Sequence, residues 1–162
     1  MKRSQFYALY GPPTVYQRVA SILAPALLLG LCVYLAVMWY TLPAEIPTNY
    51  DFDGTPTGWG SKVTLFVMPA IGFAILGILA IAERFPNSWN TGVRVTERNR
   101  AVVYHCTRDL MADVKLTMAL IFTLYSIGFL YFPEKTLWLT IGDLVLIGIP
   151  LLRYFIRVLR VR

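Results

Sequence analysis

Long uncharged hydrophobic runs dominate the pattern of apolar and polar positions along the chain. At 1.5 Å per residue, a helix of about 20 residues crosses a hydrocarbon layer of about 30 Å. The pattern therefore predicts an all-α fold, a polytopic membrane protein built as a four-transmembrane-helix bundle in a single membrane domain. The predicted helices are residues 19–40, 63–82, 116–132 and 136–155.

Composition supports lipid as the main partner and argues against a soluble enzyme. Hydrophobic residues make up 57% of the 162 residues and charged residues only 15%, which is more apolar surface than a soluble domain of this size can bury. The sequence has no hydrolase, zinc-protease, P-loop or dinucleotide-binding motif. We therefore predict that the protein is not an enzyme and has neither a cofactor nor a metal site. Cys32 and Cys106 are expected to be unpaired thiols, and His105 a solvated or interfacial residue.

The basic residues predict the orientation in the membrane. Of the 15 Lys and Arg residues, all but Lys62 and Lys135 lie before the first hydrophobic run, between the second and the third, or after the fourth. Short loops rich in Lys and Arg stay in the cytoplasm. We therefore expect both termini and the loop 83–115 inside the cell, and the loop 41–62 and a short turn at 133–135 outside. The net charge of +6 then reflects topology, and no nucleic-acid partner is expected.

The loop 83–115 is predicted to contain a basic amphipathic helix that runs into the third membrane helix. Thr96 followed by Glu97 is typical of a helix N-cap with an acidic first turn. One face of this helix is apolar, formed by Val103, Cys106, Leu110 and Val114. The adjoining basic face is suited to anionic lipid or a cytoplasmic protein, or alternatively only sets the topology. The basic residues expected to contact lipid or a partner are Arg98, Arg100, Arg108 and Lys115.

The segment 42–62, LPAEIPTNYDFDGTPTGWGSK, is predicted to be a structured outer loop. Its prolines favour extended backbone in the preceding residues, and its glycines permit turns with positive φ. These residues are Pro43, Pro47, Gly54, Gly58 and Gly60. The aromatic residues expected at the outer headgroup level are Tyr50, Phe52 and Trp59. The candidate ligand-binding residues are Asn49, Tyr50, Asp51, Asp53, Trp59 and Lys62.

This loop resembles the signature of the bacterial domain-of-unknown-function family 1648, found in short membrane proteins and in SdpI-type immunity proteins. The similar motif is LPxxIPT, an aromatic residue, a Gly-x-Pro turn and WGSK. The inner loop is also similar, at Asn90, Val93, Thr96, Glu97, Asn99 and Tyr104. The resemblance covers about residues 20–132 and implies the fold and a place in the bacterial cytoplasmic (inner) membrane.

One position departs from the family pattern. The family usually has His where this chain has Asn49, so chemistry that needs an imidazole is not expected there. SdpI-type members protect the producing cell from a secreted toxic peptide and hold a repressor at the membrane. Those members are longer and have an additional carboxyl-terminal module.

Asp51-x-Asp53-Gly54 has the carboxylate spacing with which calcium loops begin. The later acidic ligand of such loops is missing before Lys62. The other reading is a turn in which an aspartate accepts a hydrogen bond from its own backbone two residues on. This second reading needs no ion.

Asp143 interrupts the fourth hydrophobic run. An ionisable side chain within the bilayer is costly and usually faces the interior of a bundle. A proton or ion path and a buried pair with Lys62 or Lys135 both explain it.

Two classes of function remain open from the sequence. The first is an SdpI-like binding protein for peptide-toxin immunity or signal relay, whose outer loop meets a hydrophobic peptide or lipid and whose inner loop contacts a cytoplasmic protein. The alternative is a small transporter or proton-coupled channel that uses Asp143. A structural membrane protein is a further alternative, and the sequence does not indicate an oligomeric state.

Overall fold

The computed structural model describes residues 11–51, 53–132 and 135–160. Phe52 and most of the predicted 133–135 turn lie outside these ranges. The main helices are α2 (Val15–Val37), α3 (Val67–Ala82), α4 (Arg100–Tyr131) and α5 (Thr136–Leu159). The 3₁₀ turns are η1 (Met38–Tyr40), η2 (Lys62–Phe66) and η3 (Pro86–Ser88), and the strands are β1 (Glu45–Tyr50) and β2 (Pro56–Ser61).

The described residues contain four helices that are long and apolar enough to cross a membrane. These helices confirm the predicted all-α, multi-pass architecture. The predicted boundaries agree to within a few residues for both ends of the second helix. For the other three helices they agree at the end that lies nearest the two strands. The largest difference is at α4, a continuous helix of 32 residues that takes in about half of the loop predicted at 83–115, as expected for the helix predicted to run from that loop into the third span.

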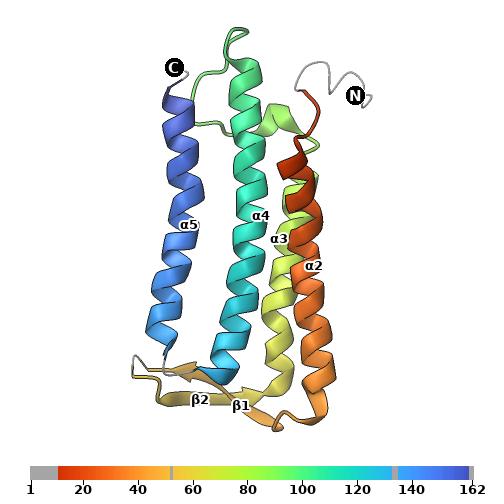
Figure 1. Cartoon of the computed structure of the whole chain (residues 1–162), viewed down its shortest axis with the longest axis vertical. Coiled ribbons are helices and arrows are strands. Elements are labelled where there is room, and N and C mark those ends of the chain that lie inside the picture. The colour runs from red at the N-terminus through yellow and green to blue at the C-terminus, as the bar shows by residue number, and fades with distance from the viewer. Residues whose placement is uncertain (1–10, 52, 133–134, 161–162) are drawn as a thin grey trace.

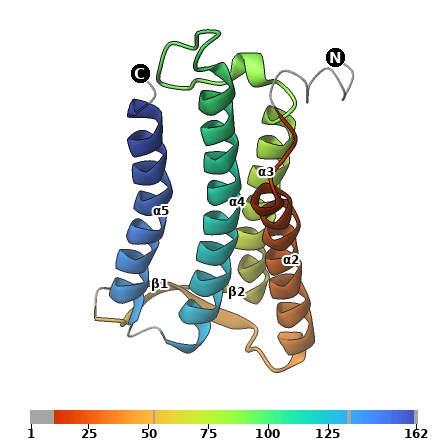
Figure 2. The ribbon, with the colours of Figure 1, turned by 45° about the horizontal axis from the view of Figure 1, so that its top comes forward.

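The helices stand side by side, with α4 in the centre (Figure 1). α4 packs against α2, α3 and α5, whereas α5 packs mainly against α4 alone. Figure 2 shows α5 at one edge of the bundle and the α2–α3 pair on the other side of α4. The strands lie across one end, which we call the sheet end. We call the opposite end, where α2 begins and α5 ends, the basic end.

Small residues allow the helices to approach closely. Ala24 and Leu28 of α2 form a buried cluster with Ala119 of α4. A Cβ atom at Gly72 of α3 would lie 2.7 Å from a methyl carbon of Leu28, so a larger residue there would require the Leu28 side chain to shift.

The hairpin is an antiparallel pair in which Glu45 faces Ser61 and Tyr50 faces Pro56. A turn closes it, with Gly54 N–H donating to the Asp51 carbonyl at 3.0 Å. Gly54 has φ of +85°, as predicted for a turn glycine. Gly58 and Gly60 instead lie within β2 and lack positive φ. At Gly60 the reason for a glycine is lack of space, since a Cβ there would lie 2.8 Å from the methyl group of Thr48.

Hydrogen bonds from side chains define where the helices begin at the basic end. Thr14 caps α2 in a reciprocal pair with Gln17, each bond being 3.2 Å long. Before α4, the Asn99 amide donates to Thr96 Oγ1 and the Thr96 amide donates to Asn99 Oδ1. This exchange resembles a capping box, so the predicted helix start at Thr96 is confirmed to within one turn.

Candidate functional sites at the two ends of the bundle

The first site is an apolar pocket of about 130 Å³ between the hairpin and the end of α4, which we call the sheet-end pocket. One wall of the pocket is the segment that enters the hairpin, and its residues belong to the LPxxIPTxY motif. The other wall is the last turn of α4. The lining residues are Leu42, Pro43, Ile46, Pro47, Tyr50, Phe129, Leu130 and Tyr131.

The hairpin is fixed against the helices by apolar packing on one side and by Tyr50 on the other. Ile46 is buried with Leu31 and Leu35 of α2. The Tyr50 hydroxyl donates to the Phe129 carbonyl at 3.2 Å, and the two rings meet edge to face with centroids 4.6 Å apart. Burial raises the pKa of the Tyr50 phenol, because the phenolate would lose solvation.

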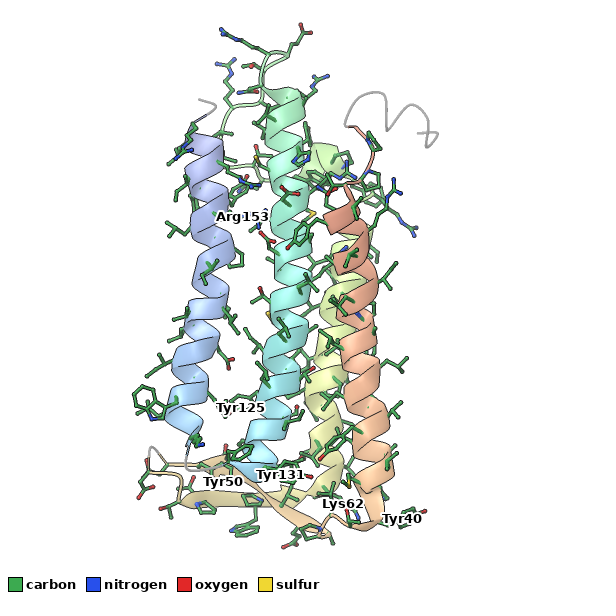
Figure 3. The ribbon with its side chains drawn as sticks, viewed as in Figure 1. Tyr40, Tyr50, Lys62, Tyr125, Tyr131 and Arg153 are labelled. Carbon is green, nitrogen blue, oxygen red and sulfur yellow. The ribbon has the colours of Figure 1, made fainter. Side chains whose placement is uncertain are left out.

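Lys62 ties the end of the hairpin to α2. Its Nζ donates to the carbonyls of Trp39 at 2.7 Å and Leu42 at 3.2 Å, and it lies 4.4 Å from the centroid of the Trp39 ring. Figure 3 shows Lys62 at the sheet end, in the region where α2 ends. A lysine at this point neutralises the partial negative charge of the helix C-terminus. Its contacts are therefore those of a structural anchor.

The structure brings only one of the six candidate ligand-binding residues into the pocket, namely Tyr50. Asn49 and Trp59 are exposed on the sheet, Trp59 by 63%. Asp53 accepts a 2.9 Å bond from the Thr55 amide, which lowers its pKa. This is the turn predicted as the alternative to a calcium loop, and the described residues contain no group of three or more potential metal ligands.

Sequence reasoning missed the apolar lining of this pocket. Pro43 and Pro47 were interpreted as residues that shape the backbone, and Leu42 and Ile46 only as part of the motif, although two apolar pairs at the same spacing indicate a shared surface. The contribution of Phe129 lay about 80 residues away and had no local signal.

The second site is a network of ion pairs near the basic end, which links α2, α4 and α5. Arg157 Nη1 lies 2.9 Å from Asp109 Oδ2, and Arg153 Nη1 lies 3.4 Å from Asp113 Oδ2. Both carboxylates are buried. From α2, Gln17 Nε2 donates to Asp109 at 2.8 Å and the Tyr16 hydroxyl donates to Asp113. We call these six side chains the ion-pair network.

The members of the network lie at one level along the helices. Counted from the sheet end at 1.5 Å per residue, the hydrocarbon layer of about 30 Å ends near residue 17 in α2, 112 in α4 and 156 in α5. These positions coincide with Gln17, Asp113 and Arg157. A layer that starts at the sheet end would therefore leave the buried carboxylates close to its boundary at the basic end, where water lowers the cost of burying them.

The structure corrects the prediction for two of the four basic residues assigned to lipid or a partner. Lys115 is 4% exposed and Arg108 is 9% exposed. Lys115 Nζ lies 2.7 Å from Glu83 Oε1 and 3.1 Å from the Ser21 hydroxyl, and Arg108 donates to the Gly11 carbonyl at 2.9 Å.

The reason for this correction is that the α2 and α3 segments bring polar groups to α4. Helical spacing identified a basic face but not the packing of α2 and α3 against it. Arg98 and Arg100 are exposed at the basic end, so their predicted contact with lipid or a partner remains a prediction. The predicted apolar face packs inside the protein, with Cys106 buried against Tyr154 and Val158 of α5. Both thiols are free among the described cysteines, and His105 is half exposed.

A cavity of about 180 Å³ adjoins the ion-pair network, and we call it the seam cavity. It lies between α2, α4 and α5. Its lining residues are Tyr16, Asp113, Leu116, Thr117, Leu146, Ile149, Pro150 and Arg153. Asp143 is partly buried one helical turn from Leu146. Its predicted pairing with Lys62 is not found, since Lys62 bonds Trp39 and Leu42, and within the described ranges Asp143 forms no ion pair.

Comparison with known proteins identifies one segment. Residues 26–73 match the family model described as Domain of unknown function (DUF1648). The match runs from the middle of α2 through the hairpin into α3, and so includes the LPxxIPT segment of the sheet-end pocket. Searches of the curated proteins and of the solved structures gave no match.

Proposed function

We propose that this chain, a multi-pass membrane protein with the DUF1648 sequence over residues 26–73, is a binding protein whose sheet-end pocket takes a large apolar side chain of a hydrophobic peptide. The single observation that carries this proposal is the pocket itself. Its motif-derived wall is apolar, and its volume of about 130 Å³ suits one large side chain.

The chemistry of the pocket favours a peptide that already lies at the membrane surface. Burying one large apolar side chain contributes about 1.5–3 kcal/mol, which corresponds to weak binding from bulk water. A peptide concentrated by partitioning into the headgroup region needs no more than this. The exposed ring of Trp59 is suited to the same region.

The position of the basic residues supports a placement with the sheet end outside the bacterial cell and the basic end in the cytoplasm. In this orientation the pocket meets secreted peptides, which is what immunity against a peptide toxin requires. The 32-residue helix α4 connects the pocket to Arg98 and Arg100 in the cytoplasm. An occupant that displaces Phe129 would move a rigid element that ends beside these exposed charges, and this supports a signal relay.

A deletion strain tests the proposal. The protein is removed, and the cells are challenged with a hydrophobic peptide encoded beside the gene. We expect the deletion to sensitise the cells and the wild-type protein to restore resistance. Leu42→Trp, which fills the pocket, should fail to restore it. Thr57→Trp, on the exposed surface of β2, is the matched control and should restore it.

Binding is measured directly with the same peptide, labelled with a fluorophore, and protein in lipid nanodiscs. Leu42→Trp should raise the Kd about tenfold or more, equal to about 1.4 kcal/mol, at unchanged thermal stability. Equal Kd values for the two tryptophan variants would refute the pocket as the binding site. Unchanged sensitivity of the deletion strain would refute the immunity role.

A further inference from the structure

The seam cavity is open, and its lining combines apolar residues with residues that carry polar side chains. The latter are Tyr16, Asp113, Thr117 and Arg153. Pro150, another lining residue, leaves the Leu146 carbonyl without its helical hydrogen bond, because a proline inside a helix cannot donate to the carbonyl four residues earlier. At about 180 Å³ the cavity has room for several water molecules with two or more polar partners each.

Asp143 lies on the same side of α5 as this cavity. Leu146, three residues further on, lines the cavity, and Leu139, four residues earlier, packs against Gly128 of α4. Residues at spacings of three and four share a helix face, so Asp143 lies along the contact between α5 and α4. Arg153 is ten residues on, about 15 Å along the helix, and Asp143 lies about 10 Å from the start of α5 at the sheet end, which places Asp143 within the hydrocarbon layer.

Toward the sheet end the α4–α5 contact is closed. A Cβ atom at Gly128 would collide with the Leu139 side chain, which leaves no space between the helices there. Tyr125 and Phe129 stack with centroids 5.6 Å apart, and Phe129 meets the Tyr50 ring. Figure 3 shows Tyr125 on the α5 side of α4, between Arg153 and the hairpin.

Toward the basic end the same contact leads to water. Asp113 at the seam cavity pairs with Arg153, and Arg153 also lies 4.0 Å from Asp109. Asp109 lies 3.5 Å from Nδ1 of His105, whose side chain is 49% exposed. Arg157 faces Asp109 from α5, and Tyr16 and Gln17 face the two carboxylates from α2. The residues Asp113, Arg153, Asp109 and His105 thus form a continuous polar connection to the surface.

We propose that the α4–α5 contact contains a one-sided proton path, in which water in the seam cavity delivers protons from the basic end to Asp143. A hydronium ion or buffer acid at the surface gives up its proton, and water molecules in the cavity pass it on. An O–H bond forms on the Asp143 carboxylate, which becomes a neutral acid, and the donor remains outside as water or buffer base. The path is independent of the sheet-end pocket and of any peptide.

The proposal gives Asp143 a reason to lie where it does. An ionised carboxylate at this depth is costly, and protonation removes that cost without an ion-pair partner. Asp113 remains paired with Arg153 and accepts a hydrogen bond from Tyr16. It therefore serves as a fixed polar group at the entrance, whereas Asp143 is the group that takes up the proton.

Infrared spectroscopy of the protein in lipid tests the uptake. The carbonyl band of a protonated carboxyl group is followed from about pH 4 to pH 9. This range covers the pKa values found for buried carboxyl groups in proteins. We expect a titrating band that Asp143→Asn removes. Identical spectra of wild type and Asp143→Asn at every pH would show that Asp143 takes up no proton, and would overturn the proposal.

The route is tested by exchange into D₂O. Leu146→Trp fills the seam cavity and should slow deuteration of the Asp143 carboxyl about tenfold or more, equal to about 1.4 kcal/mol of added barrier. Leu144→Trp is the control, since Leu144 lies at nearly the same depth but is exposed toward lipid, and it should leave the rate unchanged. Equal rates for the two folded variants would refute the cavity as the route.

The one-sided access is tested with silver ions, which are small and react with thiols. Asp143→Cys is made in a Cys32→Ser, Cys106→Ser background and reconstituted in vesicles of defined orientation. We expect silver added at the basic end to block later alkylation of the thiol, and silver added at the sheet end to have no effect. If silver added at the sheet end blocks alkylation of the thiol, or if silver blocks it from neither end, the one-sided path is overturned.

Discussion

Replacing Lys115 by methionine separates a buried role from a lipid-facing role for this residue. Methionine has nearly the same length and fills the same space, so the substitution removes mainly the charge and the hydrogen bonds. In the structure the Lys115 side chain is 4% exposed, and its ammonium nitrogen lies 2.7 Å from Glu83 Oε1 and 3.1 Å from the Ser21 hydroxyl. Its loss leaves the Glu83 carboxylate without this partner.

The expected magnitude follows from the burial of the two partners. Breaking a fully buried ion pair costs about 3–5 kcal/mol. The Glu83 side chain is 32% exposed, so water solvates the remaining carboxylate and reduces this cost. The Ser21 hydroxyl keeps its hydrogen bond to the Gln17 carbonyl, so losing the bond from Lys115 to this hydroxyl costs little stability. We therefore expect Lys115→Met to lower the free energy of unfolding by about 2 kcal/mol.

Unfolding in mixed micelles of detergent and dodecyl sulfate measures this difference. Arg100→Met is the matched control, because Arg100 is exposed on the same helix and should change stability by less than about 0.5 kcal/mol. A double-mutant cycle with Glu83→Gln should give a coupling energy between about 0.5 and 3 kcal/mol. If Lys115→Met is no more destabilising than Arg100→Met, Lys115 faces lipid and its burial in the structure is wrong.

Three further predictions concern the hairpin and the orientation. Gly54→Val should destabilise the hairpin by about 1 kcal/mol or more because φ is positive there, and unchanged thermal unfolding in detergent would contradict the turn. The lowered pKa of Asp53 means that its carboxylate supports the turn above the ordinary aspartate pKa, and that this support is lost as pH falls through the lower folded pKa. The Thr55 amide shift in NMR should therefore titrate in acid, and Asp53→Asn should abolish this titration. Reporter fusions after Arg160 and in the hairpin should give cytoplasmic and external signals respectively, and an external signal from Arg160 would overturn the orientation.

The membrane helices were predictable because their signal is local. A run of about 20 apolar residues specifies a helix across lipid whatever its neighbours are. The turn at Gly54 and the Asp53 bond to Thr55 were equally predictable, since both depend on residues two or three positions apart. The pairing of β1 with β2 was not predicted, although prolines indicated extended backbone, because the register depends on how Ile46 packs against α2.

The ion-pair network was not predictable, because its partners come from distant parts of the chain. Asp109 and Asp113 lie on a helix that looks amphipathic, and the sequence does not indicate which face α2 and α5 cover. Tyr16 and Arg153 lie about 97 and 40 residues from Asp113. Only the packed bundle shows that these residues of opposite charge meet between the helices.

The network and Asp143 are connected through the rotation of α5. This helix packs mainly on α4, and apolar contacts alone specify rotation weakly in lipid, because lipid tails are as apolar as the side chains. A shift of one residue along α5 rotates its faces by about 100°, which would move Asp143 from the α4 contact into lipid. The pairs formed by Arg153 and Arg157 exist in one rotation only. We therefore infer that the buried charges are retained because they fix the orientation of α5, and with it the direction in which Asp143 faces.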